Sequence, residues 1–314
     1  MNIIKKQGML GIDKKEIDAL IAKKKFIGLN RSPRSEKVIV SLTSYKPRIN
    51  DVKYTIYSLL NQSFPPDKLI LWLDEDSFPQ REKNLPRDLL KLKQFGLTID
   101  WCENLRPYKK LIPALEKYPD DIIVTADDDI FYRPDWLKIL YDEHIKNPDC
   151  LIAHYGYRIR INNLGKIYPR QNWHWLFTPG LSSPAMLGNP SGTGGGVLLK
   201  KSFFHSDVLR REIFFETAPI DDELWFWAMA VLNDTKTKFP FGAMNRIISV
   251  DFDEQLSGRA LWDQNKIKKD FWLQKLVERY PALLERLIRE TVEFKPYISV
   301  VLPIKNSTPP PLRA

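Results

Sequence analysis

Three consecutive carboxylates, Asp127, Asp128 and Asp129, follow a short β-branched run at residues 122–124. Clustered carboxylates repel one another, so they need either full hydration or a bound cation. Mg²⁺ and Mn²⁺ take oxygen ligands of this kind and complete their shells with water and phosphate oxygens. Because alternate residues of an extended segment point the same way, Asp127 and Asp129 are the natural pair of metal ligands. The triplet predicts a Mn²⁺ or Mg²⁺ site, with a solvated acidic turn or a helix cap as the alternative.

A second acidic triplet, Asp221, Asp222 and Glu223, precedes an apolar stretch at residues 224–230 that is typical of a buried helix. Carboxylates are favoured at the positive N-terminus of a helix, where they cap free amide groups. Capping uses one acid or two, so three in a row leave a surplus. Capping therefore does not account for the whole triplet.

The segments around these triplets predict an α/β fold. Residues 37–43 and 68–73 are apolar strands that flank a helix near residues 52–60, which makes a βαβ unit. Further strands are expected at residues 97–101 and 122–124 and from residue 151. Ligands of open α/β sheets bind beyond the carboxyl ends of the strands. We therefore expect the loops at Thr43, Asp74 and Asp127 to meet at one edge of the sheet.

The loops at this edge also carry residues suited to an anionic nucleotide. Tyr45 can stack on a base, and Arg48 or Lys109 can pair with phosphate oxygens. Alternatively, Tyr45 is a half-buried aromatic residue of a turn. Surface charge is the alternative explanation for Arg106, Lys109 and Lys110. At least one cation should face a diphosphate, since a single divalent ion leaves much of its charge unneutralised.

Residues 156–196 are aromatic, irregular and rich in glycine toward their end. The glycine run lacks the Gly-Lys-Ser/Thr ending of a phosphate loop, so close backbone approach to a sugar is the better explanation for Gly194 and Gly195. Exposed tryptophans stack on sugar rings, which makes Trp173 a candidate, although most tryptophans in a chain with nine belong to the core. We expect His154 to be a packed histidine at a strand end, with metal binding as the alternative.

Three motifs resemble, in their order, the nucleotide-binding half of bacterial family 2-like glycosyltransferases with a GT-A fold. They are Val-Ser-Leu-Thr-Ser-Tyr with a following Arg48, Ile-Leu-Trp-Leu-Asp, and Tyr-Pro-Asp-Asp-Ile-Ile-Val-Thr-Ala-Asp-Asp-Asp, within residues 37–135. The resemblance implies a Rossmann-like nucleotide-binding sheet fused to an acceptor-binding half. It also implies a divalent ion at Asp127 and Asp129 that bridges the diphosphate of a nucleotide sugar. The donor-binding residues are then Thr43, Tyr45, Arg48, Asp74, Arg106, Lys109 and Asp128.

The second triplet resembles an acidic pair that precedes a hydrophobic helix in these transferases, where one carboxylate contacts the acceptor hydroxyl. Asp222 belongs to both possible alignments of that pair and is the expected base, with Asp221 and Glu223 as the other candidates. The helix dipole should keep Asp222 ionised near neutral pH. By the same resemblance, the acceptor-binding residues are Gly194, Gly195 and Trp173.

Length and composition set the expected organisation of the chain. With 314 residues, 43% of them hydrophobic and 28% charged, it is globular and can bury one large core or two modest ones. We expect a basic helical segment at 1–35, a nucleotide-sugar-binding half at 36–150, an acceptor-binding half at 151–260, and a helical C-terminal extension with a tail at 261–314. The N-terminal helix should pack on the fold rather than lie on a membrane surface, and Pro281 should break the C-terminal helix.

Cysteine content and hydropathy bear on the compartment. Only two cysteines, Cys102 and Cys150, argue against a disulfide framework. No apolar run reaches the ~18–20 residues of a membrane span, and the N-terminus lacks the features of a secretory signal. These features predict a cytoplasmic protein, with peripheral contact at the inner face of the membrane as an option. The net charge of +9 suits anionic diphosphates, nucleic acid or anionic lipid about equally well.

The hypothesis from the sequence is a metal-dependent glycosyltransferase that moves a sugar from a nucleotide-diphosphate sugar, UDP-sugar first, to a hydroxyl of a glycan or lipid-linked acceptor in surface polysaccharide synthesis. The alternative is a non-catalytic carbohydrate- or nucleic-acid-binding protein, and we expect no nucleic-acid partner. A phosphotransferase with an Asp-X-Asp nucleophile is disfavoured because Ile130 and Phe131 follow the triplet. A carbohydrate-binding module would not explain two acidic clusters.

Overall fold

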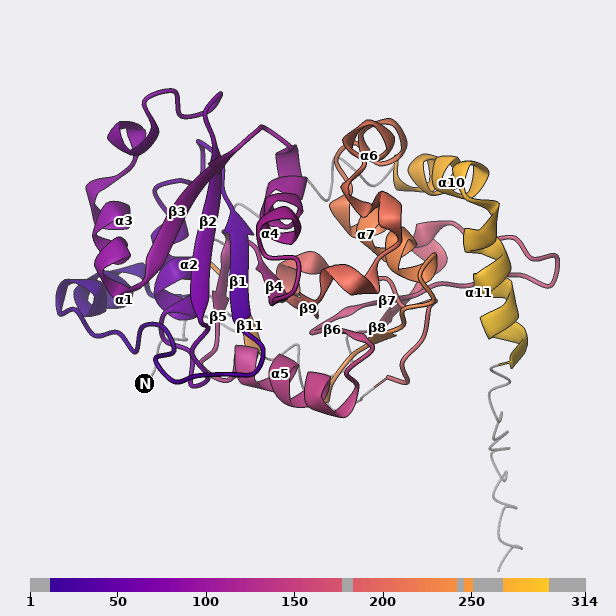
Figure 1. The fold of residues 1–314 in the computed structure, drawn as a ribbon, viewed down its shortest axis with the longest axis horizontal. Coiled ribbons are helices and arrows are strands. Elements are labelled where there is room, and N and C mark those ends of the chain that lie inside the picture. Colours follow the sequence, from indigo (N-terminus) through magenta and orange to yellow (C-terminus); the bar gives the residue numbers. More distant parts are fainter. Residues whose placement is uncertain (1–11, 177–182, 242–245, 251–267, 294–314) are drawn as a thin grey trace, which may run out of the picture.

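The computed structural model describes residues 12–176, 183–241, 246–250 and 268–293. Its centre is a seven-stranded sheet with the strand order β10-β6-β9-β4-β1-β2-β3 (Figure 1). Strands β1 to β4 run parallel to one another, whereas β9 is antiparallel to both β4 and β6. The strands are β1 Val38–Thr43, β2 Lys68–Asp74, β3 Leu97–Cys102, β4 Ile122–Ala126, β6 Leu151–Ala153, β9 Val197–Leu199 and β10 Thr237–Lys238. This is the α/β fold class that the sequence predicts.

The central strands are buried on both faces, which explains their continuous apolar sequences. Because β1, β2, β3 and β4 are parallel, their carboxyl ends lie at one edge of the sheet. Thr43 and Asp74 end β1 and β2, and Asp127 comes directly after β4. The predicted meeting of these loops at one edge is therefore confirmed.

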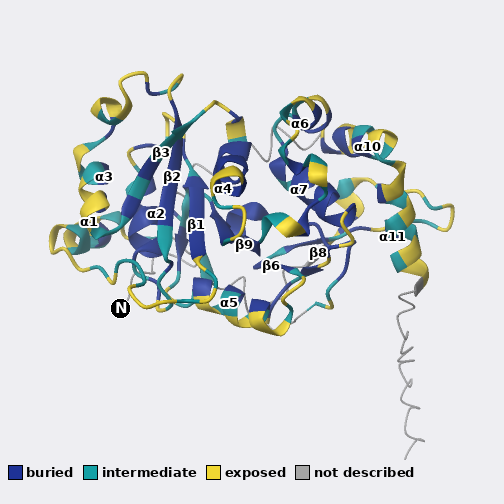
Figure 2. Ribbon diagram, viewed as in Figure 1, coloured by how far each residue is buried: buried dark blue, intermediate teal, exposed yellow. Residues whose placement is uncertain are grey.

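Helices cover both faces of the sheet, and the strands are the most deeply buried part of the chain (Figure 2). One face packs against α2 Val52–Leu59, α3 Arg87–Lys91 and α5 Trp136–Lys146. The other face packs against η3 Arg106–Lys110, α4 Ile112–Lys117, α6 Arg211–Thr217 and α7 Asp222–Val231. The second acidic triplet thus starts a helix on the same face as the turn that carries Lys109 and Lys110.

Residues 106–117 form two short helices instead of one continuous helix. The 3₁₀-helix η3 ends at Lys110, Leu111 leaves the helical region with φ −128° and ψ −45°, and α4 then begins with Pro113 in its first turn. Proline fits in the first turn of a helix because backbone N–H groups there have no partner within the helix, so its lack of an N–H costs no hydrogen bond. This break gives Lys109 and Lys110 a turn of their own above the sheet edge.

The two ends of the described chain are helical. Helix α1 Lys14–Ala22 begins with an Asp13 cap and buries Ile17 against Tyr54 and Tyr57 of α2, so it packs on the fold as expected. The C-terminal helices α10 Lys269–Arg279 and α11 Pro281–Glu293 are separated at Pro281, as predicted, and pack beside α6 and α7 (Figure 1). Residues 1–11 and the predicted tail at 307–314 lie outside the described residues.

The remaining elements are short. Two small sheets, β5 Ile130–Tyr132 with β11 Ile247–Ser249 and β7 Gly156–Arg158 with β8 His174–Leu176, flank the main sheet. The other 3₁₀-helices are η1 Arg81–Asn84, η2 Leu92–Phe95, η4 Arg170–Asn172, η5 Thr193–Gly195, η6 Lys201–Phe203 and η7 Ser206–Leu209. Strands from both sides of residue 150 pair in the main sheet, so the two expected halves share one sheet. Neither cysteine forms a disulfide, and none of the helices in the described ranges has the length and apolarity to cross a membrane.

Candidate active site

Residues 127–129 form a tight turn between β4 and β5, which we call the donor loop because the sequence predicts that it binds the donor. Asp127 is its most accessible carboxylate, with 34% of the side chain exposed, and Oδ1 accepts a hydrogen bond from Lys110 Nζ at 2.6 Å. The Asp127 amide donates to the Tyr132 hydroxyl at 2.8 Å, which fixes the backbone at the end of β4. Within the described part of the chain, Asp127 Oδ2 has no hydrogen-bond donor, although it lies close to Gly194.

Asp128 and Asp129 point toward the same cation, Arg48. Its Nη1 lies 3.0 Å from Asp128 Oδ1 and 2.9 Å from Asp129 Oδ2, and Ser44 Oγ donates to Asp128 Oδ2 at 2.6 Å. The prediction of Asp127 and Asp129 as a pair of metal ligands assumed an extended segment, whereas here Asp127 pairs with Lys110 and Asp129 with Arg48. The segment is a turn, so the alternation of an extended chain does not apply to it.

Burial controls the ionisation of this loop. It raises the pKa of Asp128, while the Arg48 charge and the Ser44 hydroxyl partly offset that effect. For Arg48 itself, burial lowers the pKa, but Asp129 and Asp128 more than compensate and raise it well above its ordinary value. Arg48 and Asp128 thus tie the end of β1 to the end of β4.

The other predicted donor-binding residues fall into two groups. Tyr45 is 44% exposed, its ring centre lies 5.6 Å from the Arg48 guanidinium, and Thr43 beside it donates to the Trp72 carbonyl at 2.9 Å. Asp74 and Lys109 are buried and form an ion pair with each other at the end of β2. Burial raises the pKa of Asp74, but the Lys109 ammonium and Ser77 outweigh burial and lower it.

Arg106 lies apart from both groups. It is exposed at the start of η3, with its guanidinium 5.9 Å from the ring centre of Phe215 on α6. The structure therefore brings together Tyr45, Arg48 and Asp128, and leaves Arg106 at the surface. Of the three η3 cations considered from the sequence, Lys110 is the one that reaches the two acidic triplets.

The second triplet divides its three carboxylates among different partners. Asp221 caps α7 by accepting from the Leu224 amide at 3.3 Å, and its Oδ2 lies 3.6 Å from Arg170 and 3.4 Å from Lys269. Glu223 accepts from the Thr193 amide at 3.0 Å and so anchors the glycine run. These contacts leave Asp222 as the carboxylate that faces the donor loop.

Asp222 is buried, and its Oδ2 lies 3.3 Å from Lys110 Nζ. Burial raises the pKa of Asp222 to about 6; Lys110 opposes this rise, whereas the neighbouring carboxylates Glu223, Asp127 and Asp221 add to it. The sequence led us to expect the helix dipole to dominate, but burial dominates instead. Asp222 is ionised at neutral pH and holds a proton more readily than an exposed aspartate.

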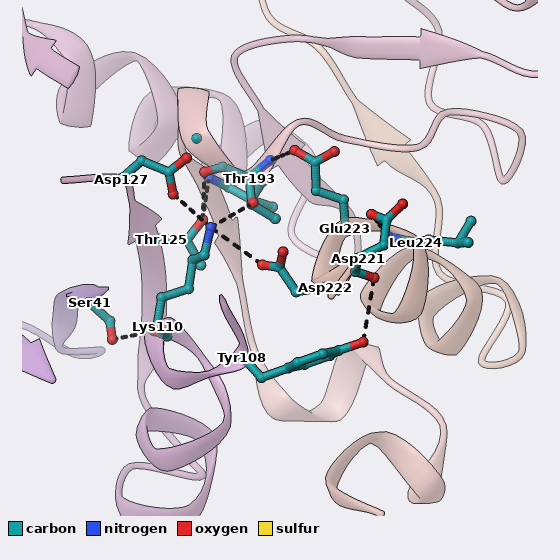
Figure 3. Close-up of polar contacts among 12 residues, drawn as sticks. Ser41, Tyr108, Lys110, Thr125, Asp127, Thr193, Asp221, Asp222, Glu223 and Leu224 are labelled. Atoms are coloured by element: carbon teal, nitrogen blue, oxygen red, sulfur yellow. Dashed lines mark hydrogen bonds and ion pairs between the residues drawn. The ribbon is translucent and has the colours of Figure 1, made fainter. Parts of the chain in front are cut away.

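Lys110 connects the two triplets (Figure 3). Besides Asp127 and Asp222, its Nζ contacts Thr193 Oγ1 at 3.0 Å, and its own carbonyl accepts from Ser41 Oγ of β1 at 2.6 Å. Burial lowers the pKa of Lys110, but Asp127 and Asp222 more than offset this and raise it, so the ammonium stays charged. One buried cation is therefore shared by the donor loop and the start of α7.

The glycine run lies directly against the donor loop. A Cβ at Gly194 would come within 2.3 Å of Asp127 Oδ2, so only glycine allows this approach. The Gly194 carbonyl accepts from the Tyr132 hydroxyl at 2.7 Å, and the Gly195 carbonyl accepts from Trp136 Nε1 at 2.7 Å. The close backbone approach seen here is to the protein's own carboxylate, and the approach of a sugar to Gly194 and Gly195 stays a prediction.

Two aromatic candidates turn out to be packed. Trp173 is 7% exposed, lies against Tyr157 and Trp227, and donates from Nε1 to the Tyr168 carbonyl at 2.8 Å. Its ring faces are therefore occupied by the core. His154 is buried with Nε2 at 3.1 Å from the Trp136 carbonyl, which is the packed role expected for it.

The sequence did not point to four residues of this site: Ser44, Arg170, Thr193 and Lys269. Thr193 had a usable signal, because it is the polar residue inside the run Gly192–Gly196. Arg170 and Lys269 lie about 50 residues before and after the triplet that they contact, and an isolated basic residue carries no signal of such a partner. Only the fold brings them together.

The comparisons with known proteins fit this geometry. A family model described as "Glycosyl transferase family 2" matches residues 42–206, more than half of the chain. This chain belongs to that family. It is therefore a glycosyltransferase, and the GT-A fold expected from its sequence is confirmed. No curated protein matches the chain.

Solved structures of S. aureus TarS are similar to this family 2 chain at low sequence identity. TarS 1–349 has a TM-score of 0.47 and 16% identity over 86% of this chain and 76% of that one. TarS 1–349 in complex with UDP has a TM-score of 0.47 and 15% identity over 78% and 71% of the two chains. A third structure, titled TarS without a residue range, has a TM-score of 0.46 and 14% identity over 86% of this chain and 46% of that one.

Proposed function

We propose that this family 2 enzyme transfers a sugar from a nucleoside diphosphate sugar, with UDP-sugars as the first candidates, to a hydroxyl of a glycan or lipid-linked acceptor. The donor diphosphate lies at the donor loop, and Asp222 takes the proton of the acceptor hydroxyl. One observation carries this proposal: Asp127 at the end of β4 and Asp222 at the start of α7 lie within 3.3 Å of the same Lys110 nitrogen. The two reaction partners would thus meet at one point (Figure 3).

The donor loop fits a hard divalent ion through Asp127 first. Its Oδ2 has no hydrogen-bond donor among the described residues, and 34% of the side chain reaches solvent. Asp129 is the second candidate ligand, although Arg48 holds its Oδ2. No group of three or more His, Cys, Asp or Glu residues suited to a metal occurs in the described ranges. Mg²⁺ and Mn²⁺ often take only one or two carboxylates and complete their shells with water and phosphate oxygens.

The chemistry follows from these residues. When bound, a divalent ion would neutralise charge that develops on the leaving diphosphate. In this proposal Arg48 contacts the nucleotide by charge and Tyr45 contacts it by stacking. Loss of the diphosphate gives the sugar oxocarbenium character, and the acceptor oxygen then attacks. For an inverting reaction, Asp222 Oδ2 accepts the acceptor proton, and its raised pKa favours that transfer.

The direct test is an assay of UDP release with a panel of UDP-sugars, each with MnCl₂ or with EDTA, together with calorimetry of UDP binding. We expect Mn²⁺-dependent UDP binding that Asp127→Asn abolishes and Asp129→Asn weakens. Asp120→Asn is the matched control, because Asp120 is exposed and lies outside the site. Equal UDP binding with EDTA and with Mn²⁺ would remove the metal from the proposal. Absence of UDP binding with EDTA and with Mn²⁺ would exclude UDP-sugars as donors, and the assay would be repeated with other nucleotide sugars.

A further inference from the structure

Lys110 is an unusual lysine because both its backbone carbonyl and its side-chain ammonium group are held by protein contacts. Its carbonyl is held by Ser41 of β1, and its Nζ contacts Asp127 at 2.6 Å, Thr193 at 3.0 Å and Asp222 at 3.3 Å. The residue is 5% exposed. Most lysines keep the ammonium group in water, so a buried one with three oxygen partners is held there by those partners.

The neighbouring lysine shows that this placement is specific. Lys109 comes from the same 3₁₀ turn and is equally buried, yet its ammonium pairs with Asp74 at the end of β2. Only Lys110 is directed at the accessible carboxylate of the donor loop. Its ammonium therefore occupies one side of the carboxylate that the proposed function gives to a divalent ion.

The charges already present at the donor loop determine whether a divalent ion is attracted or repelled there. Three carboxylates stand on the loop, and two protein cations, Lys110 and Arg48, already lie within 3.0 Å of their oxygens. A divalent ion that binds alone at Asp127 must approach an ammonium on the same carboxylate, and like charges repel strongly at that range. A diphosphate group supplies the missing negative charge and accepts hydrogen bonds from an ammonium.

We propose that Lys110 competes with the divalent ion for Asp127, so that the ion binds together with the nucleoside diphosphate and not ahead of it. The identities of the ion and of the diphosphate rest on the proposed function; the competition rests on the contacts of Lys110. When the ion takes Asp127, Lys110 keeps Asp222 and Thr193 as partners and stays buried. Lys110 is thus a positioning residue that couples donor binding to the side of the site that holds the base.

The test measures free Mn²⁺ by electron paramagnetic resonance during titration with MnCl₂, with and without UDP. Wild type should bind Mn²⁺ at least about tenfold more tightly with UDP than without it. Without UDP, Lys110→Met should bind Mn²⁺ about 10- to 100-fold more tightly than wild type, because the competing charge is gone. Lys110→Arg keeps the charge and should stay close to wild type. The double variant Lys110→Met/Asp127→Asn should lose the gain.

Lys53→Met is the matched control. Lys53 also holds two carboxylates, Asp18 at 2.9 Å and Asp88 at 2.7 Å, on helices remote from the donor loop. Its loss should leave Mn²⁺ binding unchanged, so a gain confined to Lys110→Met is not a general effect of removing a lysine. An equal gain in both variants would contradict the inference.

Two results would overturn the inference. One is a Lys110→Met protein that binds Mn²⁺ alone no more tightly than wild type. The other is a wild type that binds Mn²⁺ as tightly without UDP as with it, and this measurement needs no variant to fold. Both use Mn²⁺ binding, so they decide the inference even if no UDP-sugar is turned over. Conversely, normal turnover without the gain in Lys110→Met would overturn the inference and leave the proposed function intact.

Discussion

The two acidic triplets look alike in sequence but meet different environments. In the donor loop, Asp127 keeps a third of its side chain in solvent, and Arg48 holds the other two aspartates. At the start of α7, Asp221 and Glu223 are used for the helix cap and for the glycine run, and Asp222 is buried. An accessible carboxylate suits an ion that brings its own water ligands. A buried carboxylate with a raised pKa suits proton transfer.

Each triplet thus has one carboxylate to which the proposed function assigns a chemical role, and its other carboxylates hold the surrounding structure together. The two retained carboxylates, Asp127 and Asp222, are joined by Lys110. Their different exposure predicts that one residue governs donor binding and the other governs the rate of transfer. Substitutions that change one property and spare the other test this difference.

The largest effect is expected for Asp222→Asn. Removal of a general base costs about 10²- to 10⁴-fold in kcat, and the amide keeps the shape of the side chain. The affinity for Mn²⁺ and UDP should change far less than the rate, because Asp222 reaches the donor loop only through Lys110. Initial rates of UDP release with an acceptor, set beside calorimetry of UDP binding, measure the two quantities. A variant that lost UDP binding in proportion to rate would assign Asp222 to the donor side.

A second large effect is expected on stability, from Arg48→Met. Arg48 neutralises Asp128 and Asp129, and removal of one partner from a buried ion pair typically costs about 3–5 kcal/mol. The control is Lys138→Met on α5, whose pair with Asp142 is half exposed on both sides and should contribute less than about 0.5 kcal/mol. Urea unfolding monitored by circular dichroism gives both values. Equal losses in the two variants would mean that Arg48 does not anchor the loop.

Much of the donor side could be predicted from the sequence, because its evidence is local. The apolar strands, the polar residues that follow them and the acids after β4 are close together in the chain, and parallel strands bring their ends to one edge. The turn geometry at Asp128 and Asp129 could not be predicted, because a short acidic run does not reveal whether it is extended. The partners of Arg48 depend on that geometry.

The acceptor side was harder because its contacts join distant segments. Lys269 lies next to Asp221 only because the C-terminal helices pack on α6 and α7. The tryptophans were ambiguous for a related reason: Trp173 is apolar enough for the core and flat enough for a sugar, and only the packing distinguishes the two. Burial also reversed the expected effect on Asp222, since sequence shows the helix start but not how deeply it lies.

A smaller effect is expected for Gly194→Ala. The new Cβ would lie 2.3 Å from Asp127 Oδ2, so Asp127 must move away from its present position. We expect the affinity for Mn²⁺ with UDP to fall about tenfold, since small displacements of a binding group weaken what it holds. In the control Gly188→Ala, the Cβ would meet the Ile159 side chain at 3.1 Å, remote from the donor loop, and affinity should stay close to wild type. If calorimetry showed equal losses of affinity in the two variants, the contact between Gly194 and Asp127 would not be the cause of the loss.

The dependence of stability on pH tests the burial of Asp222. Its pKa is about 6 in the folded protein and 3.8 for an ordinary aspartate, so the folded state binds its proton more tightly than the unfolded state does. Below about pH 4 the group is protonated in both states and has no effect on folding. As the pH rises from 4 to 6, the unfolded state loses the proton first, and the free energy of unfolding falls by at most about 3 kcal/mol.

Asparagine at this position cannot ionise, so Asp222→Asn should avoid that loss. As the pH rises from 4 to 7, the stability of the variant relative to that of wild type should therefore rise by about 1–3 kcal/mol. This rise is expected even though the variant loses activity. Asp120→Asn, at an exposed position, should show a difference from wild type that does not vary with pH. Urea unfolding at several pH values measures this dependence. A pH-independent difference for Asp222→Asn would mean that Lys110 fully compensates the burial of Asp222, and the two triplets would then differ in exposure without differing in proton affinity.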